Sequence, residues 1–152
     1  MQNFPQSGKV EWVSFRTETR GEVTVPNEIN LDAENGIEGD HYKGKNHKRQ
    51  VTLIQAEHIA AAASFLGINT IDPVLLRRNI VVSGINLLAL KDARFQIGEA
   101  ILEFTGLCHP CTRMEQNLGE GGYNAMRGHG GITCRIVEGG EVRVGDEVNF
   151  IA

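Results

Sequence analysis

The sequence predicts a mainly β fold, a closed or nearly closed barrel with one or two helices. Glycine accounts for 18 of the 152 residues, about 12% against a usual ~7%, which favours tight turns over a helical bundle. Short runs of alternating apolar and polar residues recur along the chain, with closely spaced turns between them. Closing such strands into a barrel would leave few exposed edges.

The first strand is predicted over residues 9–17, KVEWVSFRT, where alternation places Val10 and Trp12 on one face. Two more short strands are predicted at residues 21–25 and 28–32, because each is rich in β-forming residues and a Pro-Asn pair separates them.

Residues 34–50 contain three glycines and no apolar period, which predicts a loop. A strand is expected at 50–54. The clearest helix covers 56–67, AEHIAAAASFLG, because its alanine-rich body ends at a glycine. A short basic step at 75–79 then leads into a strand at 80–84.

The rest of the chain is predicted to form β hairpins, over residues 94–106 and 135–151. Between these two runs, residues 111–118 are expected to start a helix. Glycines at predicted turn positions interrupt both hairpin runs: Gly98, Gly139, Gly140 and Gly145.

Composition and length are those of an ordinary globular protein. With 41% hydrophobic and 22% charged residues, disorder is disfavoured, and 152 residues match one domain. No linker interrupts the sequence, so we expect a single domain over residues 1–152. The net charge of −4 argues against a general nucleic-acid binder.

Three cysteines without a secretory signal indicate a reducing compartment. The longest apolar stretch, IAAAASFLGI, is too short to span a bilayer. We therefore expect a cytoplasmic protein that does not bind a membrane.

Cys108 and Cys111 enclose a His-Pro pair, and several interpretations of that spacing are open. A thioredoxin-like redox site needs a βαβ pattern and a later proline, but all four prolines lie at or before residue 110. A zinc site would use Cys108, Cys111, His129 and Cys134, yet a second close-spaced pair is missing. Two buried thiols, and the anchor of a metal cofactor, are the remaining interpretations.

The surroundings of the two cysteines favour the cofactor interpretation over unremarkable thiols. Six glycines and several reactive side chains fall within 28 residues: Cys108, His109, Cys111, Arg113, Arg127, His129 and Arg135. Arginines and backbone amides can hold a bulky anion, and a thiolate is a good ligand for a soft metal. Upstream, the basic segment 41–50, with Lys43, Lys45, Lys48 and Arg49, is either a solvated loop or the rim of an anion pocket.

The sequence resembles the MOSC domain, named for the C-terminal domain of molybdenum cofactor sulfurase. The matching pieces are GIEGDHY, RQVTLIQAEHI, RRNIVVSGINLLAL, IGEAILEFTGLCHPCTRME and MRGHGGITCRIVEGGEVRVGDEV, which together cover most of residues 20–148 in order. The resemblance implies a MOSC-like β-barrel with a few short α-helices that binds the molybdenum cofactor, a molybdopterin.

The resemblance implies that Cys111 is the molybdenum ligand and a catalytic residue. Cys108 is expected to handle sulfur or tune the site, or to be a bystander. Asp40 is expected to cap its loop rather than to bond the pterin. The residues expected to bind the cofactor are Arg49, Arg78, Asn79, Arg113, Arg127 and His129.

The implied activity is that of a small oxidoreductase acting on N-hydroxylated or N-oxide compounds, or of a sulfur carrier to the cofactor. A reductase would need an external electron donor protein, because nothing in the sequence resembles a flavin, haem or nicotinamide site. The alternatives are a non-catalytic cofactor carrier and a zinc-stabilised interaction domain.

Overall fold

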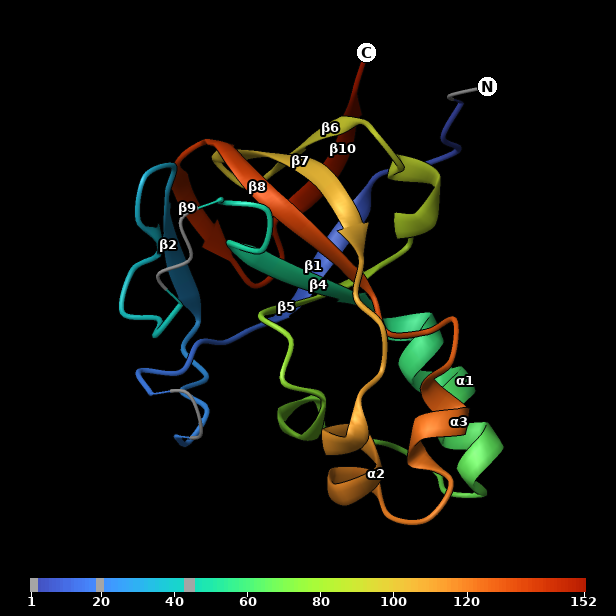
Figure 1. Ribbon diagram of the computed structural model, residues 1–152. Coiled ribbons are helices and arrows are strands. Elements are labelled where there is room, and N and C mark those ends of the chain that lie inside the picture. The colour runs from blue at the N-terminus through green and yellow to red at the C-terminus, as the bar shows by residue number, and fades with distance from the viewer. Residues whose placement is uncertain (1–2, 19–20, 43–45) are drawn as a thin grey trace.

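The computed structural model describes residues 3–18, 21–42 and 46–152, and its main feature is a closed β-barrel (Figure 1). Neighbouring strands around the barrel are, in order, β1 (Gly8–Val13), β10 (Glu147–Ile151), β6 (Arg94–Ile97), β7 (Ala100–Leu107), β8 (Ile132–Glu138), β4 (Val51–Gln55) and β5 (Ile80–Ser83). A small sheet beside it has the order β3 (Gly36–Ile37), β2 (Glu28–Asp32) and β9 (Gly140–Arg143). The predicted mainly β barrel is confirmed.

One pair of barrel strands, β4 and β5, is parallel, and this pairing explains the longest helix. Parallel neighbours need a crossover connection, because the chain must return to the end where the first strand began. Here the crossover consists of α1 (Ala56–Leu66) and a short 3-10 helix, Pro73–Leu76. The predicted helix is confirmed, and Gly67 ends it in a left-handed conformation with φ 72°.

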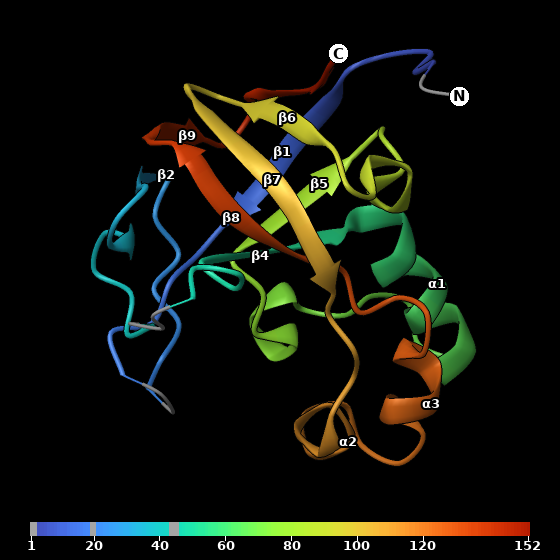
Figure 2. The ribbon, with the colours of Figure 1, turned by 45° about the horizontal axis from the view of Figure 1, so that its top comes forward.

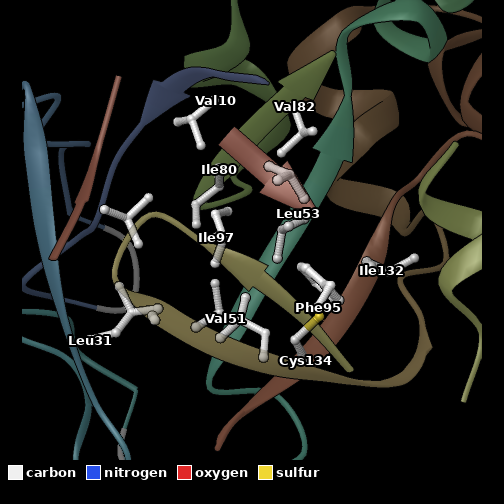
Figure 3. Packing of buried hydrophobic residues seen from close by; sticks show 14 of the residues in the cluster. Val10, Leu31, Val51, Leu53, Ile80, Val82, Phe95, Ile97, Ile132 and Cys134 are labelled. Atoms are coloured by element: carbon white, nitrogen blue, oxygen red, sulfur yellow. The ribbon is translucent and has the colours of Figure 1, made fainter. Parts of the chain in front are cut away.

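The barrel interior is filled by apolar side chains from every one of its strands (Figure 3). Leu53, Ile80, Phe95 and Ile132 are all fully buried there. Cys134, on β8, belongs to the same cluster, as its strand-interior position suggests. This packing makes the barrel the rigid support on which the loops and helices at its end are held.

Two further helices, α2 (Thr112–Leu118) and α3 (Gly122–Met126), lie with α1 beyond one end of the barrel (Figures 1 and 2). They share a second apolar cluster that includes Ile54, Ile59, Met114 and Met126. The segment 111–118 was expected to start a helix, whereas α3 was not predicted. None of the described helices is long and apolar enough to span a bilayer.

Two predictions for the first 25 residues are wrong. Residues 21–25 do not form a strand. Within the described chain, their β pairing is limited to one isolated bridge, between Thr24 and Phe15. The alternation over residues 9–17 is also interrupted, because a bulge between Val10 and Trp12 shifts the register. Val13 therefore turns into the barrel core, while Trp12 packs half-buried against the helical cluster.

The predicted hairpin over 94–106 is confirmed as β6 and β7, with register pair Ile97 and Ala100. The one over 135–151 is wrong, because its three strands pair elsewhere. β8 pairs with β7 and β4, β9 pairs with β2, and β10 pairs with β6 and β1. Gly98 and Gly145 lie in turns as expected, whereas Gly139 does not and Gly140 begins β9. The pairing partners of these strands are distant in sequence.

The barrel core should dominate stability, and strand β7 offers a matched test. Leu102 is fully buried and Leu107, on the same strand, is 50% exposed. Leu102→Ala should lower the free energy of unfolding by about 2–5 kcal/mol. Leu107→Ala should change it by less than about 0.5 kcal/mol. Urea unfolding followed by circular dichroism measures both, and equal losses would contradict the assignment of the core.

Candidate functional site

An open cavity of about 380 Å³ lies at the barrel end that faces α2, within the size range of small-molecule sites. Five arginines line it against a single carboxylate, so we call it the arginine cavity. Its walls come from the loops before β2 and β4, from β4, from the start of β5 and from α2. The lining residues are Arg16, Asp40, His41, Tyr42, Arg49, Gln50, Thr52, Arg77, Arg78, Asn79, Cys111, Arg113 and Met114.

Asn79 joins three strands at the floor of the cavity. Its Oδ1 accepts hydrogen bonds from the Thr52 backbone N–H at 3.0 Å and from the Thr52 hydroxyl at 3.1 Å. Its Nδ2 donates to the Ser14 carbonyl at 3.3 Å, and the Ser14 N–H donates back to the Asn79 carbonyl at 2.7 Å. The amide expected to bind the cofactor is thus occupied in holding β1, β4 and β5 together.

Arg78 is buried and held by carbonyl groups on both sides. Its Nε donates to the Gly130 carbonyl at 2.8 Å and its Nη1 to the Leu76 carbonyl at 3.0 Å. Among the described residues, Nη2 makes no protein hydrogen bond. The guanidinium is therefore fixed in place while one nitrogen stays free for a ligand in the cavity.

Asp40 is the one carboxylate in the lining, and it ties two loops together. Its Oδ1 accepts from the Arg16 backbone N–H at 3.0 Å and its Oδ2 from that of Tyr42 at 3.2 Å. The His41 N–H in turn donates to the Arg16 carbonyl at 2.7 Å. Asp40 thus caps its loop, and these bonds fix the backbone that carries Arg16.

Positive charge is concentrated in the cavity. Burial lowers the pKa of Arg16; nearby Asp40 opposes this effect, and the positive charges of Arg113 and Arg78 add to it. Arg78 and Arg113, from two other segments, are therefore close enough to Arg16 for their charges to repel that of its guanidinium. An anion placed among them would relieve that repulsion and accept several charge-assisted hydrogen bonds.

The three cysteines have different environments. Cys111 is exposed, lies immediately before α2 and belongs to the cavity lining. Cys108 is only 4% exposed and does not line the cavity, but its Sγ lies 4.0 Å from Nη2 of Arg49. Cys134 is in the core, where burial, and secondly the nearby Cys108, raise its pKa well above the ordinary value. Cys111 is thus the thiol available to a ligand.

The zinc interpretation loses its ligand set. Over the described chain, no three or more His, Cys, Asp or Glu side chains are grouped so as to hold a metal ion. Cys108, Cys111, His129 and Cys134 are all described residues, and they form no such group.

Of the expected cofactor-binding residues, Arg49, Arg78, Asn79 and Arg113 come together in the arginine cavity. Arg127 and His129 are not part of its lining. The Arg127 guanidinium lies over the Tyr123 ring at 5.4 Å, and the His129 ring packs against α1. Lys43 and Lys45 of the basic segment lie outside the described residues.

Two further arginines, Arg16 and Arg77, also line the cavity. Arg16 was not predicted there, and of the neighbours Arg77 and Arg78 only one, Arg78, was expected to face a ligand. Arg77 directly precedes Arg78, and its backbone is left-handed, with φ 60°. The two neighbouring side chains therefore do not point to opposite sides, as they would in a regular strand. Arg16 lies in the segment predicted to be a regular strand. The strand in fact ends at Val13, before Arg16. Predicting that end from the sequence would have indicated that Arg16 lies in a loop beside the site.

Comparison with known proteins agrees with this architecture. A family model described as the MOSC domain matches residues 38–149. The fold is similar to that of the YuaD protein from Bacillus subtilis, with a TM-score of 0.80 and 22% identity over 94% of each chain. It is also similar to YiiM from Escherichia coli, with a TM-score of 0.71 and 18% identity over 97% of this chain and 71% of that one.

YiiM from Geobacillus stearothermophilus shows the same likeness, with a TM-score of 0.77 and 11% identity over 95% of this chain and 75% of that one. At these identities the structural likeness concerns the fold alone. Among curated protein sequences, no match was found.

The arginine cavity should bind a small dianion, and sulfate is a suitable probe because its charge is constant near neutral pH. Arg16→Gln should weaken sulfate binding about tenfold, because it removes one charge-assisted contact. Isothermal titration calorimetry at constant ionic strength measures the affinity. Arg94→Gln is the control, since Arg94 pairs with Glu103 on the outer surface, outside the lining. Equal weakening in both variants would contradict a specific anion site.

Proposed function

Because this chain belongs to the MOSC domain family, we propose that it binds the molybdenum cofactor in the arginine cavity, with the Cys111 thiolate as the protein ligand to molybdenum. MOSC domains are associated with molybdenum cofactor binding or sulfurase-type function. The observation that carries the proposal is the position of Cys111, an exposed thiol in the wall of a cavity lined by five arginines.

The residues present fit this cofactor chemically. A thiolate is the soft ligand that such a metal accepts, and the molybdopterin ends in a phosphate. Arg16, Arg78 and Arg113 can hold a phosphate through charge-assisted and bidentate hydrogen bonds. Tyr42 in the same lining adds a phenolic hydroxyl for a heterocycle, whereas the side chains of Gln50 and Thr52 already bond within the protein.

We assign the bound protein an oxidoreductase activity on N-hydroxylated or N-oxide compounds. When bound, the cofactor would supply two-electron reduction, in which the substrate N–O bond would be cleaved and its oxygen released as water, with two electrons from an external donor protein and two protons from solvent. This chain contributes an electropositive pocket that orients an oxygen-bearing group beside Cys111. It also fixes Arg78 and the loop of Arg16, so that little reorganisation is needed on binding.

Sulfur transfer to the cofactor is the second candidate, and the two cysteines bear on it differently. A persulfide carrier must expose its sulfur to donor and acceptor, whereas Cys108 is buried and outside the cavity lining. Burial therefore favours a tuning role for Cys108 through its contact with Arg49. Sulfur transfer would have to use Cys111.

Metal content tests the ligand assignment. Protein expressed in a cofactor-competent host should contain close to one molybdenum per chain by elemental mass spectrometry. Cys111→Ala should lose nearly all of it, because the protein-to-metal bond is removed, while Cys108→Ala should retain at least about half. Zinc in place of molybdenum, lost with either substitution, would overturn the proposal.

Turnover separates an enzyme from a cofactor carrier. With a chemical electron donor, the molybdenum-loaded protein should reduce N-hydroxylated compounds, and Arg113→Gln should lower kcat/KM about tenfold, because one orienting charge is lost. Arg143→Gln, on the surface of β9, is the control for removing a positive charge elsewhere. Full cofactor content without turnover on a broad panel would favour the carrier instead.

A further inference from the structure

His129 lies outside the arginine cavity, yet the chain that follows it reaches the cavity floor. Its ring packs edge-on against that of His58 on α1, with centroids 4.8 Å apart, and at a tilt against Phe65 at 5.8 Å. The buried Nδ1 of His129 has no hydrogen-bond partner within the described chain. A buried nitrogen without a partner is uncommon and calls for an explanation.

The two residues after His129 are held tightly on both sides. The Gly130 carbonyl accepts the 2.8 Å hydrogen bond from Nε of Arg78, and the Gly131 carbonyl accepts one from the Cys108 N–H at 2.8 Å. A Cβ on Gly130 would lie 1.9 Å from the Cys108 carbonyl oxygen, and one on Gly131 would lie 2.0 Å from that of Leu53. The segment therefore has no room to absorb a displacement of His129 locally.

We propose that His129 is a positioning residue: through Gly130 it holds Arg78 at the cavity, and its contact with His58 makes anion affinity depend on pH. The proposal rests on the proposed function only in requiring that the arginine cavity binds an anion. His129 then acts through Arg78 without touching the ligand, which also accounts for its place outside the lining.

The charged groups around the pair are few. On α1 these are His58 itself and Glu57, whose carboxylate accepts a hydrogen bond from the Gly84 N–H at 2.9 Å. β4 and β5, which also contact α1, carry no charged or titratable side chain, and α3 carries only Tyr123. Arg127, on the same loop as His129, lies over the Tyr123 ring.

The environment disfavours a charged His58. Burial lowers the pKa of His58 from its ordinary value of 6.5, His129 lowers it further, and Glu57 opposes both. The observed packing is therefore fully stable above pH 6.5 and loses stability as the pH falls below 6.5 toward the lowered pKa of folded His58. Charging His58 separates the rings, displaces residues 129–131 and loosens the bond between Gly130 and Arg78.

The expected loss of anion affinity at low pH has to be separated from any direct effect of His41, the histidine in the cavity lining. Arginine side chains stay charged in this pH range. A weakening of anion binding at low pH that disappears in a His58 variant and persists in a His41 variant would point to the His58–His129 contact.

The experiment is sulfate titration by calorimetry at about pH 7.5 and about pH 5.5, at constant ionic strength. Wild type should bind sulfate at least about fivefold more weakly at the lower pH. His58→Phe keeps an aromatic ring that cannot be protonated, and should bind equally at both pH values while matching wild type at the higher one. His41→Gln is the control, because His41 lines the cavity, and it should keep the loss at low pH.

If His58→Phe does not fold, His58→Gln serves the same purpose, because it also lacks a titrating group. Equal or tighter sulfate binding by wild type at the lower pH would overturn the coupling and leave the anion site intact. Persistence of the loss in the His58 variants would overturn it as well. Absence of sulfate binding at both pH values would overturn the coupling together with the anion-binding cavity of the proposed function.

Discussion

The parallel pairing of β4 and β5 is the constraint on which the rest of the structure depends. It is the one parallel pair among the described barrel strands, and a tight turn cannot connect parallel neighbours. The chain must therefore leave the barrel at the end of β4 and return to the opposite end of the strand pair. That excursion places α1 beyond the barrel and brings residues 77–79 back at the start of β5, where Asn79 locks onto Thr52 and Ser14. The helical cluster and the cavity floor both follow from this single crossover.

The arginine cavity holds like charges close together, which lowers the stability of the fold at this place. Holding several guanidinium groups near one another, with Arg78 buried, is unfavourable in the absence of an anion, as the lowered pKa of Arg16 indicates. The protein compensates with backbone hydrogen bonds to Asp40 and with carbonyls that hold Arg78. Such locally unfavourable arrangements are expected at functional sites, where the ligand completes the interactions.

Patterns within short stretches of sequence predicted much of the fold. The α1 helix and its glycine stop, the β6–β7 hairpin and the core position of Cys134 follow from local periodicity and turn chemistry. The pairing of β9 with β2 did not, because it joins segments about a hundred residues apart and no local signal specifies the partner. The resemblance to the MOSC domain supplied the barrel closure that periodicity alone only suggested.

The same distinction holds for the candidate site. Cys111, Arg49, Arg78 and Arg113 were found because they sit in dense or motif-like segments. Arg16 was missed because its segment alternates like a strand, and only the bulge and the loop contacts turn it toward the cavity. His129 was expected in the cavity because glycines surround it. Two of those glycines, Gly130 and Gly131, instead allow the backbone to pack closely against Cys108 and Leu53.

The unequal burial of the three thiols has a practical consequence. Cys111 is open to solvent, whereas Cys108 and Cys134 are enclosed. A thiol-specific dye therefore modifies one cysteine on the folded chain and three on the unfolded chain, with no engineered label. The number of dye molecules bound per chain therefore measures the fraction of unfolded protein. A metal bound at Cys111 would protect the one thiol that reacts on the folded chain.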